Sequence, residues 1–277
     1  MNQINYKVGF IGAGNMSEAL ISGILENKLF EPQEVVIADV SQSRQEHIVN
    51  KYGVKVADNN SLLVKSSSVI ILAVKPQQIT QVISEIKEVL VLEKAVLVSI
   101  AAGITISYLE TLLAKPIKIV RIMSNTPAQI KCGATVFSLN KLAGEDERNI
   151  IKFIFGAVGI ITEVSEELLN AVTALSGSGP AYIFKLCEIM IQAGREMGLP
   201  LELSEKLAIQ TILGASQMLS STGQKPEELR KAVTSPGGTT QAALDYLDKN
   251  NFKEIFISAL KAARNRGEEL NYKLGNN

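Results

Sequence analysis

Short apolar runs alternate with helical patterns through the first 164 residues. The runs are rich in Val and Ile, and they span residues 7–11, 34–39, 68–74, 95–100, 117–122, 133–139 and 157–164. Such runs are typical of strands that are buried on both faces of a parallel sheet. Segments between them, such as 105–114 and 145–155, repeat their apolar positions at helical spacing. We therefore predict an α/β, Rossmann-like, doubly wound domain over residues 1–164.

Beyond about Ser165 the strand patterns stop and only helical patterns follow. They cover residues 166–175, 181–197, 203–220, 226–233, 239–248 and 252–270. Ser178 and Pro180 lie in a Gly-rich break and predict a helix start, with Ser178 as the N-cap. The helix over 181–197 is apolar on much of its circumference, as a helix buried on several sides is. We expect an all-α domain over 165–277 that packs against a second copy of itself. The alternative is that these helices cover the first domain.

A glycine turn follows the first apolar run. Gly12, Gly14 and Ser17 form the pattern G-x-G-x-x-S, and a helical pattern begins at once. In a dinucleotide site the first Gly makes the turn, the second lets the pyrophosphate approach, and the phosphates lie on the helix N-terminus. The third position is small here but is not the usual Gly. The motif indicates a dinucleotide site, and its place at the first strand strengthens that interpretation.

The second strand ends in Asp39, and Ser41, Ser43 and Arg44 follow. Asp39 lies where an acidic residue binds the adenine ribose diol, which favours NADH. The two serines and Arg44 favour a 2′-phosphate, and therefore NADPH. We predict NADPH, because several hydroxyls and an Arg together form a phosphate pocket, and we keep NADH as the alternative. A simpler interpretation makes Asp39 the N-cap of a helix over 44–52.

Small or turn-forming residues close three further strands. They are Ala73, Val74, Lys75 and Pro76 after one strand, Ala101, Ala102 and Gly103 after the next, and Asn125 and Thr126 after the third. In a doubly wound sheet the carboxyl ends of the strands face the ligand crevice. One such turn is ordinary, but several together indicate a site.

A second glycine-rich segment opens a helix in the C-terminal half. It consists of Ser235, Pro236, Gly237, Gly238, Thr239 and Thr240. Such a loop leaves several backbone N–H groups unpaired and pointing one way, which makes a site for a small anion. The two threonine hydroxyls add donors and acceptors. The simpler interpretation is a Gly-rich helix start with Thr at the N-cap.

The composition excludes several classes of protein. Lys plus Arg and Asp plus Glu are 28 each, so the chain has no electrostatic footprint for nucleic acid or an anionic membrane. One His and two scattered Cys cannot form an ordinary zinc site, so we expect no metal. The longest apolar run is too short to span a bilayer, and residues 1–5 show no signal-peptide pattern. We predict a soluble cytoplasmic protein.

Taken together, the motifs resemble the pyrroline-5-carboxylate reductase family. The resemblance rests on residues 9–16, 73–76, 99–103, 125–127, 176–182 and 234–240, which occur in the family's order. The first motif is shared by many dinucleotide enzymes, whereas the last is quite specific to this family. The chain departs from the family at Ser124, where proline is usual, at Ser17, where glycine is common, and at Lys185, an unusual charge in the long helix.

The resemblance implies the NAD(P)H-dependent reduction of 1-pyrroline-5-carboxylate to L-proline, the last step of proline biosynthesis. It implies a homodimer through the C-terminal helices, which in this family is often assembled further into a decamer. The cofactor-binding residues are then Ile11, Gly12, Gly14, Asn15, Met16, Asp39, Ser41, Asn60, Ala73, Val74, Lys75, Pro76, Ala101, Ala102, Gly103, Asn125 and Thr126. The substrate lies at residues 235–240, with Thr240 as the catalytic residue at the ring nitrogen. A protonated imine is already electrophilic, so the cofactor supplies the hydride and the protein supplies orientation.

Two other functions are weighed against this one. A β-hydroxyacid dehydrogenase is similar at residues 177–179 and has a lysine soon after, as Lys185 would be. However, Ile189 stands where that family has asparagine, and the loop at 235–240 would be unexplained. A non-catalytic NAD(P)-binding protein of the same fold would not need Thr240 or both intact glycine motifs.

Overall fold

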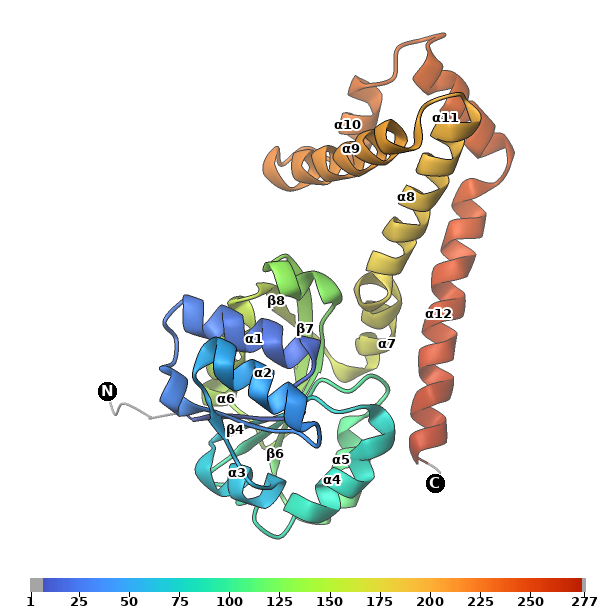
Figure 1. The fold of residues 1–277 in the computed structure, drawn as a ribbon. Helices are drawn as coiled ribbons and strands as arrows, with labels where there is room; N and C mark the ends of the chain where they lie inside the picture. Colours follow the sequence, from blue (N-terminus) through green and yellow to red (C-terminus); the bar gives the residue numbers. More distant parts are fainter. Residues whose placement is uncertain (1–6, 276–277) are drawn as a thin grey trace. The chain divides into compact units, whose positions relative to one another are not determined.

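The computed structural model describes residues 7–275, so the stretch without a signal-peptide pattern, 1–5, lies outside the described residues. The chain forms two compact units. One unit runs to Ser178 and takes in the chain from Ala263 onward, and the other is Gly179–Ala262 (Figure 1). The domain boundary expected at residue 164 remains a prediction. Among the described residues, no helix has the length and apolar character needed to cross a membrane.

The first unit is built on one sheet. Within residues 7–275 this sheet has eight strands in the order β3-β2-β1-β4-β5-β6-β7-β8. The strands are β1 (Val8–Ile11), β2 (Val35–Ala38), β3 (Lys55–Val56), β4 (Val69–Leu72), β5 (Val96–Ser99), β6 (Lys118–Met123), β7 (Gly133–Leu139) and β8 (Gly159–Glu163). The pairs from β3 to β6 are parallel, which confirms the doubly wound prediction.

Two features of the sheet were not predicted. The short strand β3 is exposed and lacks an apolar run, so it leaves no clear pattern in the sequence. Strands β6 and β7 are antiparallel. Only a single 3₁₀ turn, Thr126–Ile130, lies between these two strands. That connection is too short for a parallel crossover, which needs a dozen or more residues.

The sheet is covered on both faces by helices. These are α1 (Asn15–Glu26), α2 (Gln42–Tyr52), α3 (Asn60–Ser66), α4 (Ile79–Ile86), α5 (Ile106–Leu113) and α6 (Glu145–Gly156). Successive strand residues point to opposite faces, so β1 sends Phe10 to one hydrophobic core and Ile11 to the other. The first core is closed by side chains from α1, α2 and α6, and the second by side chains from α3, α4 and α5.

The remaining helices follow β8. They are α7 (Leu169–Val172), α8 (Gly179–Glu196), α9 (Leu201–Ser221), α10 (Pro226–Ala232), α11 (Thr239–Lys249) and α12 (Phe252–Gly275). Each lies where a helical pattern predicts it. Helices α8 and α9 cross closely at Gly194, where an added Cβ would lie 2.8 Å from the Ser204 hydroxyl oxygen. Small residues at this crossing therefore set the packing of the second unit.

The expected break before α8 does not occur. A π-helical turn, Thr173–Gly177, continues α7, and Ser178 N donates to Thr173 O at 2.8 Å. Ser178 has right-handed helical angles, so its prediction as an extended N-cap is wrong. Gly177 instead packs against Met123, whose flexible terminal methyl would have to move to admit a Cβ.

Candidate functional site

The turn between β1 and α1 requires glycine at its first position. Gly12 has φ +97°, and an added Cβ would lie 2.6 Å from Ala73 O. Its amide donates to Ala38 O at 2.8 Å, which ties the turn to β2. The buried Ser17 donates its hydroxyl to Gly12 O at 2.6 Å. Ser17 thus holds the turn from the position where glycine is usual.

The second glycine leaves space for a ligand. Gly14 is the N-cap of α1, and Glu18 N makes the first helical hydrogen bond to its carbonyl at 2.9 Å. No heavy atom of the described residues, apart from its chain neighbours, lies within 4 Å of a Cβ built on Gly14. The amides of Asn15 and Met16 lie before the first helical bond, as in a phosphate site. The residues present here fit a dinucleotide pyrophosphate.

Asp39 faces the glycine turn. Its Oδ2 accepts from Ala13 N at 2.6 Å and its Oδ1 accepts from Ser41 N at 2.8 Å. The N-cap of α2 is Ser41, so the simpler interpretation of Asp39 as that cap is wrong. Each carboxylate oxygen keeps a lone pair that can accept from a ribose hydroxyl.

The residues expected to hold a 2′-phosphate divide into two groups. The hydroxyls of Ser41 and Ser43 lie 3.1 Å apart on the exposed start of α2. The Arg44 side chain instead bonds to the glycine turn and to α1. Its Nε donates to Ala13 O in the turn at 2.6 Å, and its Nη2 donates to Glu18 in α1. Two of the three guanidinium nitrogens are therefore already bonded within the protein, which weakens the prediction of Arg44 as a phosphate ligand.

A cleft of about 560 Å³ opens beside the turn. It collects eight of the predicted cofactor residues, namely Ile11, Gly12, Gly14, Asp39, Asn60, Ala73, Val74 and Lys75. The Asn60 side-chain amide donates to Glu85 at 2.6 Å, so Asn60 lines the cleft with its amide nitrogen already in use. Because turns after β1, β2 and β4 meet here, the carboxyl ends of parallel strands form the crevice, as the sequence predicts.

The other predicted cofactor residues do not line this cleft. They are Asn15, Met16, Ser41, Pro76, Ala101, Ala102, Gly103, Asn125 and Thr126. Asn125 has both ends of its side chain bonded, because its Nδ2 donates to Ser176 O at 3.0 Å and its Oδ1 accepts from Ala134 N at 2.9 Å. This side chain joins the end of β6 to β7 and to the π-helical turn.

Ser124 also has a structural role. Its hydroxyl lies 2.9 Å from the Thr135 hydroxyl on β7. Proline, which is usual in the family at this position, has no hydroxyl to make that bond. The departure at Ser124 therefore adds a link between antiparallel strands.

The Gly-rich loop of the second unit opens α11. Gly237 has φ +70°, a conformation that favours glycine. Gly238 is the N-cap, so the simpler interpretation with Thr at that position is wrong. Ala242 N makes the first helical bond to Gly238 O at 3.1 Å, which places the amides of residues 239–241 at the open helix end. The half-buried Thr240 is the second residue of this helix.

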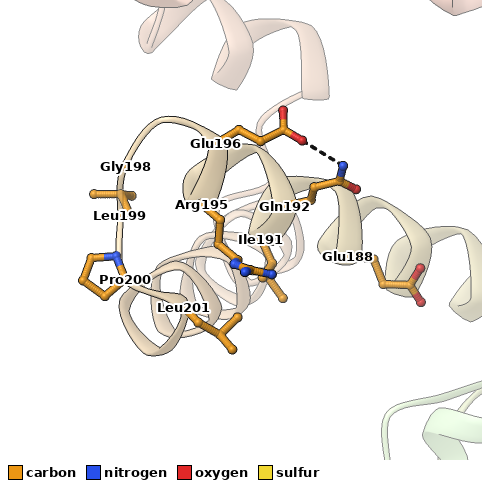
Figure 2. Close-up of a pocket in the computed structure, with 9 residues that line it drawn as sticks. All are labelled: Glu188, Ile191, Gln192, Arg195, Glu196, Gly198, Leu199, Pro200 and Leu201. Carbon is orange, nitrogen blue, oxygen red and sulfur yellow. Dashed lines mark hydrogen bonds between the residues drawn. The ribbon is translucent and has the colours of Figure 1, made fainter.

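Features that the motifs did not indicate lie on α8. Lys185 pairs with Glu188 at 3.1 Å, and both side chains are exposed, so this lysine forms a surface ion pair. A hollow of about 960 Å³ lies where α8 turns into α9, and Gln192 donates to Glu196 at 2.9 Å on its wall. Figure 2 shows the residues that line it. None of the predicted site residues lines this hollow.

Comparisons with known proteins cover both parts of the chain. Residues 166–270 match the family model described as pyrroline-5-carboxylate reductase dimerisation. Residues 7–103 match the model described as NADP oxidoreductase, coenzyme F420-dependent. The pyrroline-5-carboxylate reductase of Arabidopsis thaliana is 41% identical over 266 residues, which are 96% of each chain. That of Synechocystis is 35% identical over 98% of this chain and 100% of the relative.

Solved structures agree with these relatives. The pyrroline-5-carboxylate reductase of Coxiella burnetii superimposes with a TM-score of 0.91 and 39% identity, over 96% of this chain and 98% of that one. The Plasmodium falciparum enzyme, solved with NADP bound, gives a TM-score of 0.85 and 32% identity over the same shares. Identity above 30% over nearly the full length, with both glycine motifs in place, shows that the chain belongs to the pyrroline-5-carboxylate reductase family.

Proposed function

We propose that this protein reduces 1-pyrroline-5-carboxylate to L-proline with a hydride from NADPH, the last step of proline biosynthesis. The observation that carries the proposal is the presence, in one chain, of the dinucleotide turn at Gly12 and Gly14 and of the Gly-rich loop at 235–240. These stand in a sequence that is 41% identical over 96% of its length to a reductase of this name. Neither the β-hydroxyacid dehydrogenase nor the non-catalytic alternative accounts for the loop.

The proposed roles follow from the chemistry of each half. When bound, the reduced nicotinamide supplies the hydride. The amides of residues 14–16 bind the pyrophosphate, and Asp39 accepts from the adenine ribose. The amides at the start of α11 bind the substrate carboxylate, and the Thr240 hydroxyl hydrogen-bonds the ring nitrogen. The hydride adds to the carbon of the protonated C=N bond, the π electrons become the nitrogen lone pair, and the nitrogen keeps its proton.

The proposed cofactor is NADPH, and NADH is accepted as well. Support for NADPH comes from the NADP oxidoreductase family model, from the relative solved with NADP, and from the paired hydroxyls of Ser41 and Ser43. Asp39 acts against it, because a carboxylate repels a 2′-phosphate and accepts from a ribose diol. We expect a higher kcat/KM with NADPH in steady-state kinetics, and the opposite order would remove NADPH from the proposal.

The proposed assembly is a homodimer through the C-terminal helices. The match of residues 166–270 to a dimerisation model supports it, as do the many exposed apolar side chains of α8 and α9. We propose that such dimers assemble further into a decamer. We place the enzyme in the cytoplasm, because reduced nicotinamide cofactors are regenerated inside the cell.

One assay tests the activity. Purified protein is mixed with NADPH and 1-pyrroline-5-carboxylate, and loss of NADPH absorbance is followed together with the proline formed. The proposal predicts one proline for each NADPH consumed. Formation of NADPH from NADP⁺ and a β-hydroxyacid, without reduction of 1-pyrroline-5-carboxylate, would contradict the proposal and support the dehydrogenase. Cofactor binding with no turnover of either substrate would contradict it and support the non-catalytic protein.

A further inference from the structure

The peptide groups of Ala13, between the two glycines of the turn, are held from opposite directions. Asp39 Oδ2 accepts from Ala13 N at 2.6 Å, and Arg44 Nε donates to Ala13 O at 2.6 Å. The Ala13 side chain is fully buried. Ala13 therefore cannot shift without breaking a charge-assisted hydrogen bond, and such bonds are the stronger ones.

Arg44 is itself held in place by Glu18. The Glu18 carboxylate accepts from Arg44 Nη2 and from Lys51 Nζ, and it lies 3.0 Å from His47 Nε2. Burial alone would raise the pKa of Glu18, but the hydrogen bonds from His47, Arg44 and Lys51 outweigh it and lower the pKa to about 2. Glu18 is therefore ionised at neutral pH, and it connects the first turn of α1 to α2.

We propose that Glu18 is a positioning residue for the dinucleotide. Glu18 orients Arg44, Arg44 holds the Ala13 carbonyl, and the turn at Gly12 and Gly14 keeps the geometry that receives the pyrophosphate. Preorganised donors bind more tightly, because the ligand does not have to order them. This inference rests on the proposed function in taking the ligand to be a nicotinamide dinucleotide.

Two observations favour action at a distance over direct contact. Glu18 is not among the residues that line the cleft, so it reaches the cofactor only through Arg44. Arg44 uses its Nε and Nη2 within the protein, which commits the side chain to the turn and not to a 2′-phosphate. The effect of Glu18 is therefore the same for NADPH and NADH, since both carry the same pyrophosphate.

The test is equilibrium binding of NADPH and of NADH, followed by cofactor fluorescence in the absence of imine. Glu18→Ala is expected to raise both Kd values by a similar factor, about three- to tenfold, as the indirect loss of a charged hydrogen bond. Glu18→Gln is expected to raise them less, because its amide oxygen still accepts from Arg44. Glu18→Gln also provides the test if Glu18→Ala does not fold.

Glu26→Gln is the matched control. Glu26 lies at the other end of α1, where it pairs with Lys131 and accepts from the Ser22 hydroxyl. The control removes a carboxylate from the same helix, at the end far from the glycine turn. We expect wild-type Kd values for both cofactors in this variant.

Two results would overturn the inference. A change in Kd for NADPH alone, in either direction, would assign Arg44 to the 2′-phosphate. A lowered melting temperature with unchanged Kd values would make the Glu18 contacts a structural brace only. Because binding is measured without imine, a protein that binds both cofactors but does not reduce 1-pyrroline-5-carboxylate would contradict the proposed function and leave this inference standing.

Discussion

The two units of the molecule bury their apolar side chains to very different degrees. In the first unit the sheet and its helices enclose two cores, and side chains such as Phe10 and Phe137 are fully buried. Within 179–262, all of which the structure describes, Ala208 is the one buried hydrophobic residue. On α8, Phe184 is 61% exposed and Ile189 is 52% exposed.

The two units therefore gain their stability in different ways. Burial of apolar surface is the main favourable term in folding and in stable association. The first unit obtains it within one chain, because helices cover both faces of its sheet. The second unit leaves an apolar surface of the kind that marks a protein–protein interface. Its match to a dimerisation model indicates that a second copy of the chain packs against this apolar surface.

The largest expected effect comes from a charge on the apolar face of α8. Ile189→Glu would bury an unpaired carboxylate in the proposed dimer interface, which costs about 3–5 kcal/mol. We expect the dimer dissociation constant to rise by at least about a hundredfold, measured by light scattering over a dilution series. Lys185→Ala, on the same helix, removes only an exposed ion pair and is expected to leave the dimer unchanged. Equal dimer stability in both variants would place the interface elsewhere.

The two glycines of the dinucleotide turn are expected to respond differently to alanine. At Gly12 the added methyl meets Ala73 O and φ is +97°, so we expect a loss of about 2 kcal/mol of stability and a melting temperature lower by about 5 °C. At Gly14 the methyl enters open space and φ is −71°. Gly14→Ala should keep the wild-type melting temperature and raise the KM for NADPH. Calorimetry and kinetics on both variants check this, and a lowered melting temperature for Gly14→Ala would refute the distinction.

A third prediction concerns the loop of the second unit. Thr240→Ala should lower kcat by about ten- to a hundredfold, near the low end for a lost acid–base group, because the imine arrives protonated and water can replace the hydroxyl. Thr240→Ser should recover most of the rate. Thr222→Ala, at an exposed threonine outside the loop, is the control and should be near wild type. Steady-state kinetics decide, and a Thr240→Ala enzyme with wild-type kcat would remove Thr240 from the mechanism.

The same loop offers a test of the carboxylate site. A Cβ on Gly238 would lie 2.5 Å from the Ser235 hydroxyl oxygen. Gly238→Ala should therefore displace the Ser235 side chain and raise the KM for the imine, while binding of NADPH stays unchanged. A raised KM for NADPH instead would mean that this loop serves the cofactor.

The smallest expected effect is the pH dependence of Glu18. Its pKa is lowered from 4.5 to about 2 in the folded protein. A lowered folded pKa means that the ionised group stabilises the fold fully above about pH 4.5 and that this contribution is lost as the pH falls through about 2. The stability difference between wild type and Glu18→Gln, from urea unfolding, should shrink over that range. A difference that stays constant from neutral pH to pH 2 would contradict the assignment.

Much of the fold could be predicted because its elements have strong local patterns. The apolar runs indicated every strand except β3, including β8, which is largely exposed, and the helical spacing located α8 to α12. The short strand β3 has no such pattern. The glycines before α8 predict a break, because glycines commonly end helices, but here the helix continues and Gly177 packs against Met123. That contact joins residues far apart in the sequence, so no local rule reveals it.

Part of the site could be predicted, because local patterns locate the strands and the turns that follow them. The cleft brings together Gly12, Asp39 and Ala73. They follow β1, β2 and β4, which are neighbours in the sheet, so the strand order alone places their turns side by side. The side-chain partners of Arg44 and Asn125 could not be foreseen, because they depend on rotamers and on contacts with distant segments. Ser17 departs from the glycine pattern in the sequence, and its hydrogen bond to Gly12 O explains the departure.

We infer that the helical unit is completed by a second copy of the chain, whereas the first unit encloses its own cores. The most direct test is the mass of the wild-type protein in solution, measured by light scattering at micromolar concentration. We expect at least twice the chain mass of 29.9 kDa. A mass of 29.9 kDa for active enzyme would contradict it.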